Sequence, residues 1–294
     1  MDLNALCAAL PGVDAEFDFS FRKNTTVGIG GTAPLALYPR EGQWEKCLKV
    51  LCGTPYFVMG RGSNLLASDA GYDGVVLRTD RSCALRAEGH TLYASCGASI
   101  AKTLAFAARN GMCGLEFLAG IPASIGGAVF MNAGAQGHCI GERILSVVAF
   151  EGGKVITLPR SECGFGYRSS RFSESGGVIL AVRFKMERCE PSQAFALVSR
   201  ALAARRHLPK GKSLGCVFKN PPCGVSAGAI IERAGLKGAA AGGAFVSHEH
   251  ANFILNRGDA TANDYISLVN YVREKTFERT GIRLWEEIRT IGEI

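Results

Sequence analysis

Glycines alternate with apolar residues between positions 114 and 135 in a pattern that could hold a large ligand against bare backbone. The stretch reads GLEFLAGIPASIGGAVFMNAGA and carries no charge after Glu116. Glycine lets the backbone approach a ligand closely, and consecutive N–H groups in such a bend form an anion-binding concavity. No Gly-Lys-Ser/Thr of a nucleoside-triphosphate loop is present. The stretch therefore favours a bulky, partly apolar cofactor with a diphosphate, and a packed turn without a ligand is the alternative.

Two further glycine clusters precede this stretch. The first, GRGSNLL at 60–66, follows an expected buried strand and combines small residues, one cation and hydroxyl or amide donors, which suits a diphosphate. The other, VGIGGTAP at 27–34, superficially matches a dinucleotide fingerprint. Pro34 and the alternating residues after it predict a strand, however, where a Rossmann fold needs a helix. We therefore reject a Rossmann fold.

A series of motifs gives the chain a family resemblance. Single motifs of this length are weak, whereas the whole series occurs in family order from about residue 20 to the C-terminus. The motifs are NTTVGIGG at 24–31, the stretches at 60–66 and 114–135, GYRSSRF at 166–172, GCVFKNP at 215–221, AGLKG at 234–238, HANF at 250–253 and LWEEIR at 284–289. Together they resemble the UDP-N-acetylenolpyruvoylglucosamine reductases (MurB) of peptidoglycan precursor synthesis, in the shorter subgroup that lacks a tyrosine-bearing insertion.

The resemblance implies an α+β fold. A two-subdomain FAD-binding (PCMH-type) fold would cover residues 20–188, with subdomains of about 20–80 and 81–188. A smaller α+β substrate-binding domain would follow at 189–294. The site between the two subdomains would hold FAD, because ligand sites favour domain interfaces.

The resemblance also implies the reaction and its ligands. NADPH would reduce noncovalent FAD, which would then reduce the enolpyruvyl group of UDP-N-acetylglucosamine enolpyruvate to give UDP-N-acetylmuramate. No metal is implied. The residues implied to bind FAD are Asn24, Thr25, Gly60, Arg61, Gly62, Ser63, Asn64, Leu65, Gly120, Pro122, Ser124, Gly126, Gly127, Asn132 and Gly134. Those implied to bind substrate are Tyr167, Lys219, Asn220 and His250, although Lys219 as a merely exposed lysine is an alternative.

The second reduction step poses the chemical problem. Hydride added to one alkene carbon pushes negative charge toward the carboxylate, so a cation is needed there and an acid nearby. Arg168 matches the family's arginine after tyrosine, and its guanidinium can hold the carboxylate. Glu287 matches the family's glutamate and could donate a proton if protonated. A surface ion pair is the alternative for each.

Cys216 stands where the family most often has the serine that donates a proton to carbon. A thiol, with an ordinary pKa of about 8.5, is far more acidic than an aliphatic hydroxyl and can make the same donation. The alternative is that Cys216 packs inertly while another group or a water supplies the proton. Ala229 also replaces a frequent lysine, and the approach PKGKSL at 209–214 is unusual, so substrate contacts there stay open.

Composition limits the function classes. The 294 residues suffice for two or three small domains. No apolar run approaches the roughly 20 residues of a membrane span, and no basic segment begins a signal sequence. The 11 cysteines are odd in number and lack Cys-x-x-Cys spacing, which favours free thiols over disulfides or zinc. We therefore expect a cytoplasmic protein without a membrane partner, and a monomer.

Charge favours small anionic ligands over nucleic acid. The net charge of +7 is spread without a long basic tract, and aromatic residues do not interleave with the cations as stacking platforms would. A flavin oxidase or dehydrogenase on the same fold is one competing class, against which the 215–221 motif and Glu287 argue. A noncatalytic FAD- or nucleotide-binding regulator is the other, against which Arg168 and Glu287 argue.

Periodicity and turn signals predict the elements that position these residues. A short helix is expected within 1–20, and Gly152-Gly153 predicts a hairpin turn. The sequence TAND at 261–264 predicts a capping box, and Gly281 predicts the end of that helix. The expected helices are 43–51, 99–110, 191–207, 227–234 and 261–280, and the expected strands are 33–38, 56–59, 74–78, 91–95, 146–151, 154–159, 178–186 and 253–256.

Overall fold

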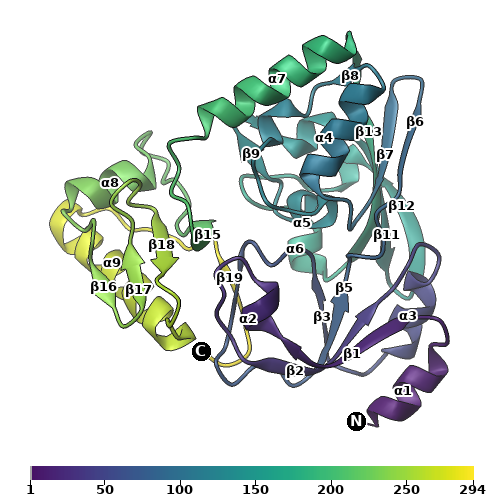
Figure 1. The fold of residues 1–294 in the computed structure, drawn as a ribbon, viewed down its shortest axis with the longest axis horizontal. Helices are drawn as coiled ribbons and strands as arrows, with labels where there is room; N and C mark the ends of the chain where they lie inside the picture. The colour runs from purple at the N-terminus through teal and green to yellow at the C-terminus, as the bar shows by residue number, and fades with distance from the viewer. Residues whose placement is uncertain (1) are drawn as a thin grey trace. The chain divides into compact units, whose positions relative to one another are not determined.

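The computed structural model describes residues 2–294, which form two compact units (Figure 1). The first unit contains the residues up to Glu16 together with 35–61 and 74–206, and the second contains 17–34, 62–73 and 207–294. Two N-terminal segments thus pack with the C-terminal third of the chain. The boundaries 20–188 and 189–294 concern functional domains, and that assignment stays a prediction.

A small sheet, most of whose residues belong to the first unit, has the strand order β1-β2-β5-β3. Strands β2 and β3 lie on either side of β5 and both pair parallel with it. Because β2 and β3 run in the same direction, the chain needs a crossover between them, which contains α3. Leu35 and Leu37 of β2 pack with Trp44 and Leu48 of α3 in one core. The predicted helices within 1–20 and at 43–51 and the predicted strands at 33–38, 56–59 and 74–78 are confirmed, whereas β1 was not predicted. Their bounds are α1 (Leu3–Ala9), β1 (Asp14–Ser20), β2 (Thr32–Tyr38), α3 (Trp44–Val50), β3 (Tyr56–Met59) and β5 (Val75–Arg78).

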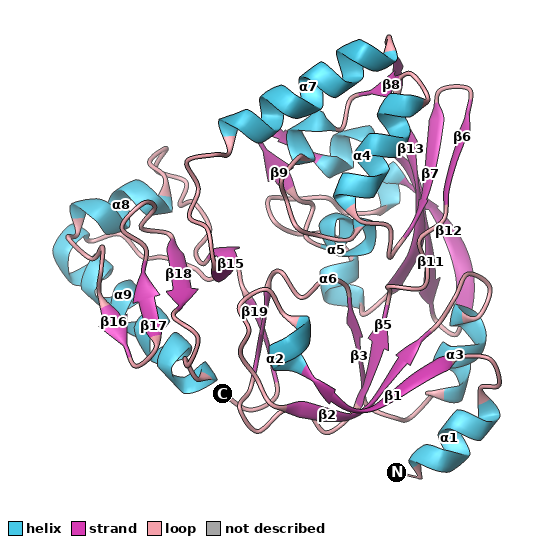
Figure 2. Cartoon of the chain, in the orientation of Figure 1, coloured by secondary structure: helices cyan, strands magenta, loops and turns pink. Residues whose placement is uncertain are grey.

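A second, larger sheet in the same unit is antiparallel, with the order β12-β11-β13-β7-β6. Helices α4 and α5 pack on it, and α7 packs on α4 (Figure 2). Gly152 and Gly153 both have positive φ in the predicted β11–β12 turn. The helices are α4 (Ile100–Arg109), α5 (Ile125–Phe130), α6 (Phe172–Ser175), α7 (Pro191–Ala204) and the 3-10 turns η1 (Glu116–Leu118), η2 (Ile140–Arg143) and η3 (Arg160–Glu162). The strands are β6 (Leu85–Glu88), β7 (Thr91–Ser95), β8 (Met112–Cys113), β9 (Gly134–Ala135), β10 (His138–Cys139), β11 (Ile144–Glu151), β12 (Lys154–Pro159), β13 (Val178–Lys185) and β14 (Glu187–Arg188).

Helix α5 was not expected from the sequence. Gly126 and Gly127 lie in its first turn, and glycine disfavours a helix by about 1 kcal/mol per residue relative to alanine. The Ser124 hydroxyl accepts a hydrogen bond from the Gly127 amide as its N-cap. A Cβ at Gly126 would lie only 2.9 Å from the Cβ of Cys96. Close packing against Cys96 therefore requires the glycine that local propensity disfavours.

The second unit contains a four-stranded sheet with the order β15-β18-β17-β16. Helix α9 packs on β16 and β17, and α8 packs on α9 around the fully buried Tyr265. A separate parallel pair joins β19 to β4. The bounds are α2 (Phe21–Asn24), β4 (Leu65–Ala67), β15 (Lys212–Cys216), α8 (Ala227–Arg233), β16 (Ala240–Ala241), β17 (Ala244–Val246), β18 (Phe253–Asn256), α9 (Ala262–Thr280) and β19 (Arg289–Ile291).

The ends of α9 confirm the capping prediction. The Thr261 hydroxyl accepts from the Asp264 amide at 3.0 Å, and the Asp264 carboxylate accepts from the Thr261 amide at 2.9 Å. The Asp69 carboxylate accepts from the Ala262 amide at 2.8 Å, which satisfies one more free donor at this end. Gly281 ends the helix with φ of +69°. Within residues 2–294, no helix has the length and apolarity needed to cross a bilayer.

Candidate active site

In the first unit, two of the predicted cofactor segments meet at Ser124. The buried Ser124 hydroxyl caps α5 at Gly127. A Cβ at Gly60, after strand β3, would lie 2.3 Å from this oxygen. Only glycine therefore fits at position 60, and the end of β3 lies against the start of α5. Gly120 and Pro122, in the loop before α5, are exposed.

The loop after β3 has unused hydrogen-bond donors. Within residues 2–294, neither a carbonyl nor a side chain accepts from the backbone amides of Arg61, Gly62 and Ser63. Gly62 has φ of +63°, which glycine adopts without strain. Consecutive free amides next to one arginine are a donor set for a diphosphate.

In the second unit, hydrogen bonds join the rest of this loop to the N-terminal motif. The Thr26 amide donates to the Gly62 carbonyl at 3.2 Å, and the Thr26 hydroxyl donates to the Ser213 carbonyl at 2.6 Å. At the end of the short helix α2, the side chains of Asn24 and Thr25 donate hydrogen bonds to the backbone carbonyls of residues 20 and 21. Thr26 was not predicted as a site residue, although it lies in the motif at 24–31.

The same unit brings Asn64, Cys216 and Glu287 into one neighbourhood. The Asn64 side-chain amide donates to the Glu287 carbonyl at 2.9 Å. The Glu287 amide in turn donates to the carbonyl of Val217, the residue after Cys216, at 2.7 Å. Three predicted motifs that lie far apart in the sequence are therefore adjacent.

Cys216 follows an irregularity at the end of β15. The register against β18 shifts between Ser213 and Cys216, and Gly215 has φ of +78°. A bulge with glycine in a left-handed conformation bends a strand and redirects the side chain that follows it. Glycine at 215 therefore sets the orientation of the half-buried Cys216.

Asn252 fixes the backbone next to Cys216, a role that was not predicted. Its Oδ1 accepts from the Phe218 amide at 2.9 Å, and its Nδ2 donates to the Phe218 carbonyl at 2.8 Å. The side chain is buried. Its position within the quoted HANF motif was the available signal.

His250 is half-buried, and burial lowers its pKa below the ordinary value. Its Nδ1 accepts from the Asn252 amide at 3.2 Å, so the neutral ring carries its proton on Nε2. Its ring also packs on Phe253 and leaves no room for a Cβ at Gly228, which would lie 2.8 Å from Cε1. At neutral pH, His250 is therefore a hydrogen-bonding group and not a cation.

The other three predicted substrate residues, Asn220, Lys219 and Tyr167, differ in exposure and in hydrogen bonding. The Asn220 Oδ1 accepts from the Ala227 amide at 2.9 Å, at the start of α8, so this atom supports the fold. Lys219 is half-buried, with its amide bonded to the Trp285 carbonyl at 2.8 Å. Tyr167 is 58% exposed, and the Arg168 guanidinium carbon lies 5.8 Å from the centre of its ring.

Arg168 lies in a tight turn of the first unit. Gly166 and Ser169 exchange backbone hydrogen bonds of 3.0 and 3.3 Å, with Tyr167 and Arg168 between them. Arg168 has φ of +53°, an uncommon and strained value for a residue that is not glycine. Its Nη1 donates to the Gly134 carbonyl at 3.2 Å. The predicted arginine is thus adjacent to the end of the predicted cofactor stretch.

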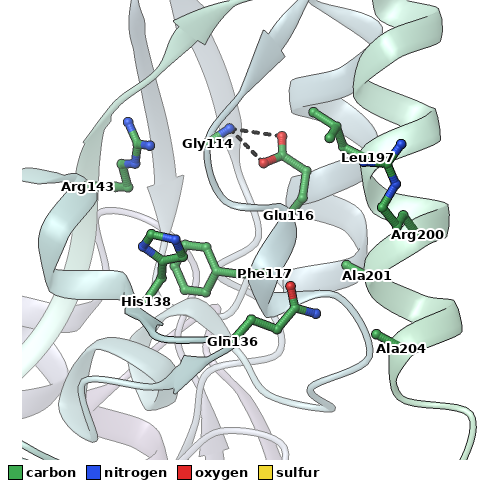
Figure 3. A pocket seen from close by; sticks show the side chains of 10 residues that line it. All are labelled: Gly114, Glu116, Phe117, Gln136, His138, Arg143, Leu197, Arg200, Ala201 and Ala204. Atoms are coloured by element: carbon green, nitrogen blue, oxygen red, sulfur yellow. Dashed lines mark hydrogen bonds between the residues drawn. The ribbon is translucent and has the colours of Figure 1, made fainter.

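A cavity of about 400 Å³ adjoins the beginning of the 114–135 stretch (Figure 3). Both carboxylate oxygens of Glu116 accept from the Gly114 amide, at 2.9 and 2.8 Å. The rings of Phe117 and His138 are 5.6 Å apart, and Arg143 pairs with a glutamate outside the cavity. None of the predicted cofactor, substrate or catalytic residues, all of which the structure describes, lines this cavity. The predicted site is therefore not assigned to it.

Two family models and several relatives of known name match this chain. One family model, an FAD binding domain, matches residues 40–158, and a second, the C-terminal domain of UDP-N-acetylenolpyruvoylglucosamine reductase, matches residues 206–291. The reductase of that name from Protochlamydia amoebophila is 39% identical over 271 residues, which cover 91% of this chain and 90% of that one. The one from Streptococcus pneumoniae is 37% identical, covering 97% and 96%. The chain belongs to this reductase family.

A solved structure agrees with this membership. The UDP-N-acetylenolpyruvylglucosamine reductase of Thermus caldophilus matches with a TM-score of 0.83 and 35% identity, covering 95% of this chain and 99% of that one. The predicted α+β architecture, with a PCMH-type FAD-binding fold followed by the family's C-terminal domain, is confirmed. FAD as cofactor is confirmed as well. The consecutive free amides of the 61–63 segment, next to the Arg61 side chain, fit such a group.

Proposed function

We propose that this chain is the NADPH-dependent FAD enzyme that reduces UDP-N-acetylglucosamine enolpyruvate to UDP-N-acetylmuramate in peptidoglycan precursor synthesis. Family membership over nine-tenths or more of the chain supports the reaction. The observation that carries the residue assignments is the chain of two hydrogen bonds from Asn64 through Glu287 to the Cys216 loop. These bonds support the assignments because they join a predicted cofactor segment to the backbone of Glu287 and of the residue after Cys216.

Each catalytic residue has a separate task in the second step. When bound, FAD supplies the hydride that NADPH has delivered. Arg168 holds the substrate carboxylate through its planar guanidinium and stabilises the negative charge that develops there. The Cys216 thiol gives its proton to the other alkene carbon. Glu287, when protonated, donates a hydrogen bond to the charged intermediate and can return a proton to the Cys216 thiolate.

The remaining assignments follow the family pattern. We propose that Tyr167, Lys219, Asn220 and His250 contact the UDP-sugar, with His250 donating from Nε2. Residues 20–188 would form the FAD-binding domain and residues 189–294 the substrate domain. We further propose a monomer that acts in the cytoplasm, and size-exclusion chromatography with light scattering checks the monomer directly.

An anaerobic titration tests the function. Stoichiometric NADPH should bleach the flavin absorbance, and the enolpyruvyl substrate should then restore it with formation of one UDP-N-acetylmuramate per flavin. Bleaching without restoration would mean a flavin reductase with a different acceptor, and the substrate assignment would be wrong.

A further inference from the structure

We propose that Asn132 is a positioning residue for Arg168, a task different from the cofactor contact expected from the sequence. In this inference, which rests on the proposed role of Arg168, the buried amide of Asn132 holds one end of the strained turn that carries the guanidinium. Three observations in the first unit support it: the hydrogen bonds of Asn132, the conformation of the turn, and the space that surrounds the amide.

Both ends of the Asn132 amide bond to the protein. Its Oδ1 accepts from the Gly141 amide at 3.0 Å, and its Nδ2 donates to the Gly166 carbonyl at 2.8 Å. A flipped amide would place nitrogen against an N–H group and oxygen against a carbonyl, so only this orientation is satisfied. The residue is only 5% exposed. Both polar atoms of the Asn132 side chain are therefore used by hydrogen bonds inside the protein.

The Gly166 carbonyl belongs to the turn that presents Arg168. The positive φ of Arg168 is a strained conformation that persists only where the surrounding structure holds it. On the far side of the turn, the Ser170 hydroxyl donates to the Phe130 carbonyl at 2.7 Å. Asn132 and Ser170 thus anchor the two sides of the turn to one short segment, residues 130–132.

Glycine at position 141 leaves the space that the Asn132 amide occupies. A Cβ at Gly141 would lie 2.9 Å from the Asn132 Oδ1 and 2.8 Å from the Phe165 ring. Asn132 itself has φ of +42°, a conformation that asparagine tolerates better than most residues. Position 132 thus combines an αL backbone with a side chain that needs one acceptor and one donor. Asparagine meets all three requirements.

Loss of the Nδ2 donor should let the turn relax and move the guanidinium. A displacement of about 1 Å in a catalytic group can cost ~10²-fold in rate. The effect should be confined to the steps that use Arg168. Flavin retention and flavin reduction by NADPH should therefore change little, while affinity for the product carboxylate and reoxidation by substrate should fall.

The variant Asn132→Asp tests this, because it keeps the size, the αL tolerance and the acceptor for Gly141 but places an oxygen against the Gly166 carbonyl. We expect reoxidation to slow by about tenfold or more, and calorimetric binding of UDP-N-acetylmuramate to the oxidised protein to weaken. Asn110→Asp is the matched control, since the exposed Asn110 Nδ2 also donates to a backbone carbonyl, that of Phe106. It should behave as the wild type.

A double-mutant cycle separates positioning from a general structural role. In an Arg168→Ala background, Asn132→Asp should cost nothing further in product affinity or reoxidation, because its effect acts through the missing guanidinium. An equal cost in both backgrounds, or no cost in either, would overturn the inference. If Arg168→Ala itself reoxidises normally, the proposed role of Arg168 fails instead.

A second variant covers the case in which Asn132→Asp does not fold. Ser170→Ala removes the other anchor of the turn and should reproduce the same selective slowing, with flavin content retained. Normal product affinity and reoxidation in Ser170→Ala would then overturn the inference that these anchors position Arg168.

Discussion

Arg168 and Cys216 are each oriented by backbone that differs from regular secondary structure. Arg168 has a left-handed φ in a two-residue turn, and Cys216 follows a strand irregularity that contains Gly215. Strained or irregular backbone persists when the surroundings hold it in place, and it is concentrated at functional sites. The two residues thereby acquire defined directions that an ordinary strand or helix would not give them.

At position 168, we expect Arg168→Lys to lose most of the second step. An ammonium is a point charge that cannot form the two parallel hydrogen bonds of a guanidinium with a carboxylate. Flavin reduction by NADPH, measured first in the same stopped-flow experiment, is the internal control. Turnover near the wild-type rate would remove Arg168 from the site.

At the scale of elements, helix α9 has a local stability determinant at Thr261. We expect Thr261→Ala to lower the free energy of unfolding by about 1 kcal/mol, because the Asp264 amide loses its acceptor. Denaturant unfolding measures the change. Ser267→Ala, an exposed position within the same helix, is the control and should change stability little.

The same cap should make stability depend on pH. Hydrogen bonds from the Thr261 amide and hydroxyl lower the pKa of Asp264. A carboxyl group with a lowered pKa stabilises the fold above its ordinary pKa of about 3.9, and this contribution is lost as the pH falls through the lowered value. Asp264→Asn should therefore cost stability at pH 7, and its difference from the wild type should shrink in acid. A constant difference down to pH 2 would contradict the cap assignment.

The elements that the sequence predicted are those with local signals. Helix α9 was predicted because Thr261, Asp264 and Gly281 mark its ends within the helix itself. Helix α5 was not, because its glycines are explained only by contact with Cys96 from another element. The same distinction holds for the candidate active site. Its motifs could be recognised in the sequence, but the hydrogen bond from Asn64 to Glu287 joins residues 223 positions apart, and no local pattern predicts it.

At the scale of the whole molecule, the chain carries the family's two parts over nearly its full length. Predicted cofactor residues lie in both compact units, with Gly60 and Ser124 in the first and Asn24 and Asn64 in the second. A ligand that binds only the folded state stabilises that state by mass action, so bound FAD should raise the stability of the protein.

We therefore expect the purified protein to be yellow and to release its FAD on denaturation. The glycine-rich segments 60–66 and 120–134 contain no histidine or cysteine to which FAD could be attached covalently. Adding FAD to the deflavinated protein should raise its melting temperature in a concentration-dependent manner. Flavin that stays with the denatured chain would contradict noncovalent binding. A protein that neither contains nor regains FAD would contradict the flavoenzyme assignment.

The most direct test of the account is stopped-flow analysis of Cys216→Ala in the two half-reactions. NADPH should reduce its flavin at close to the wild-type rate, because no proton donor to carbon is needed there. Reoxidation by the enolpyruvyl substrate should slow by the ~10²–10⁴-fold typical of a lost general acid. Cys216→Ser should retain partial activity, and wild-type reoxidation should fall at alkaline pH, where the thiol no longer carries its proton. An alanine variant that reoxidises at the wild-type rate would show that the proton comes from another group.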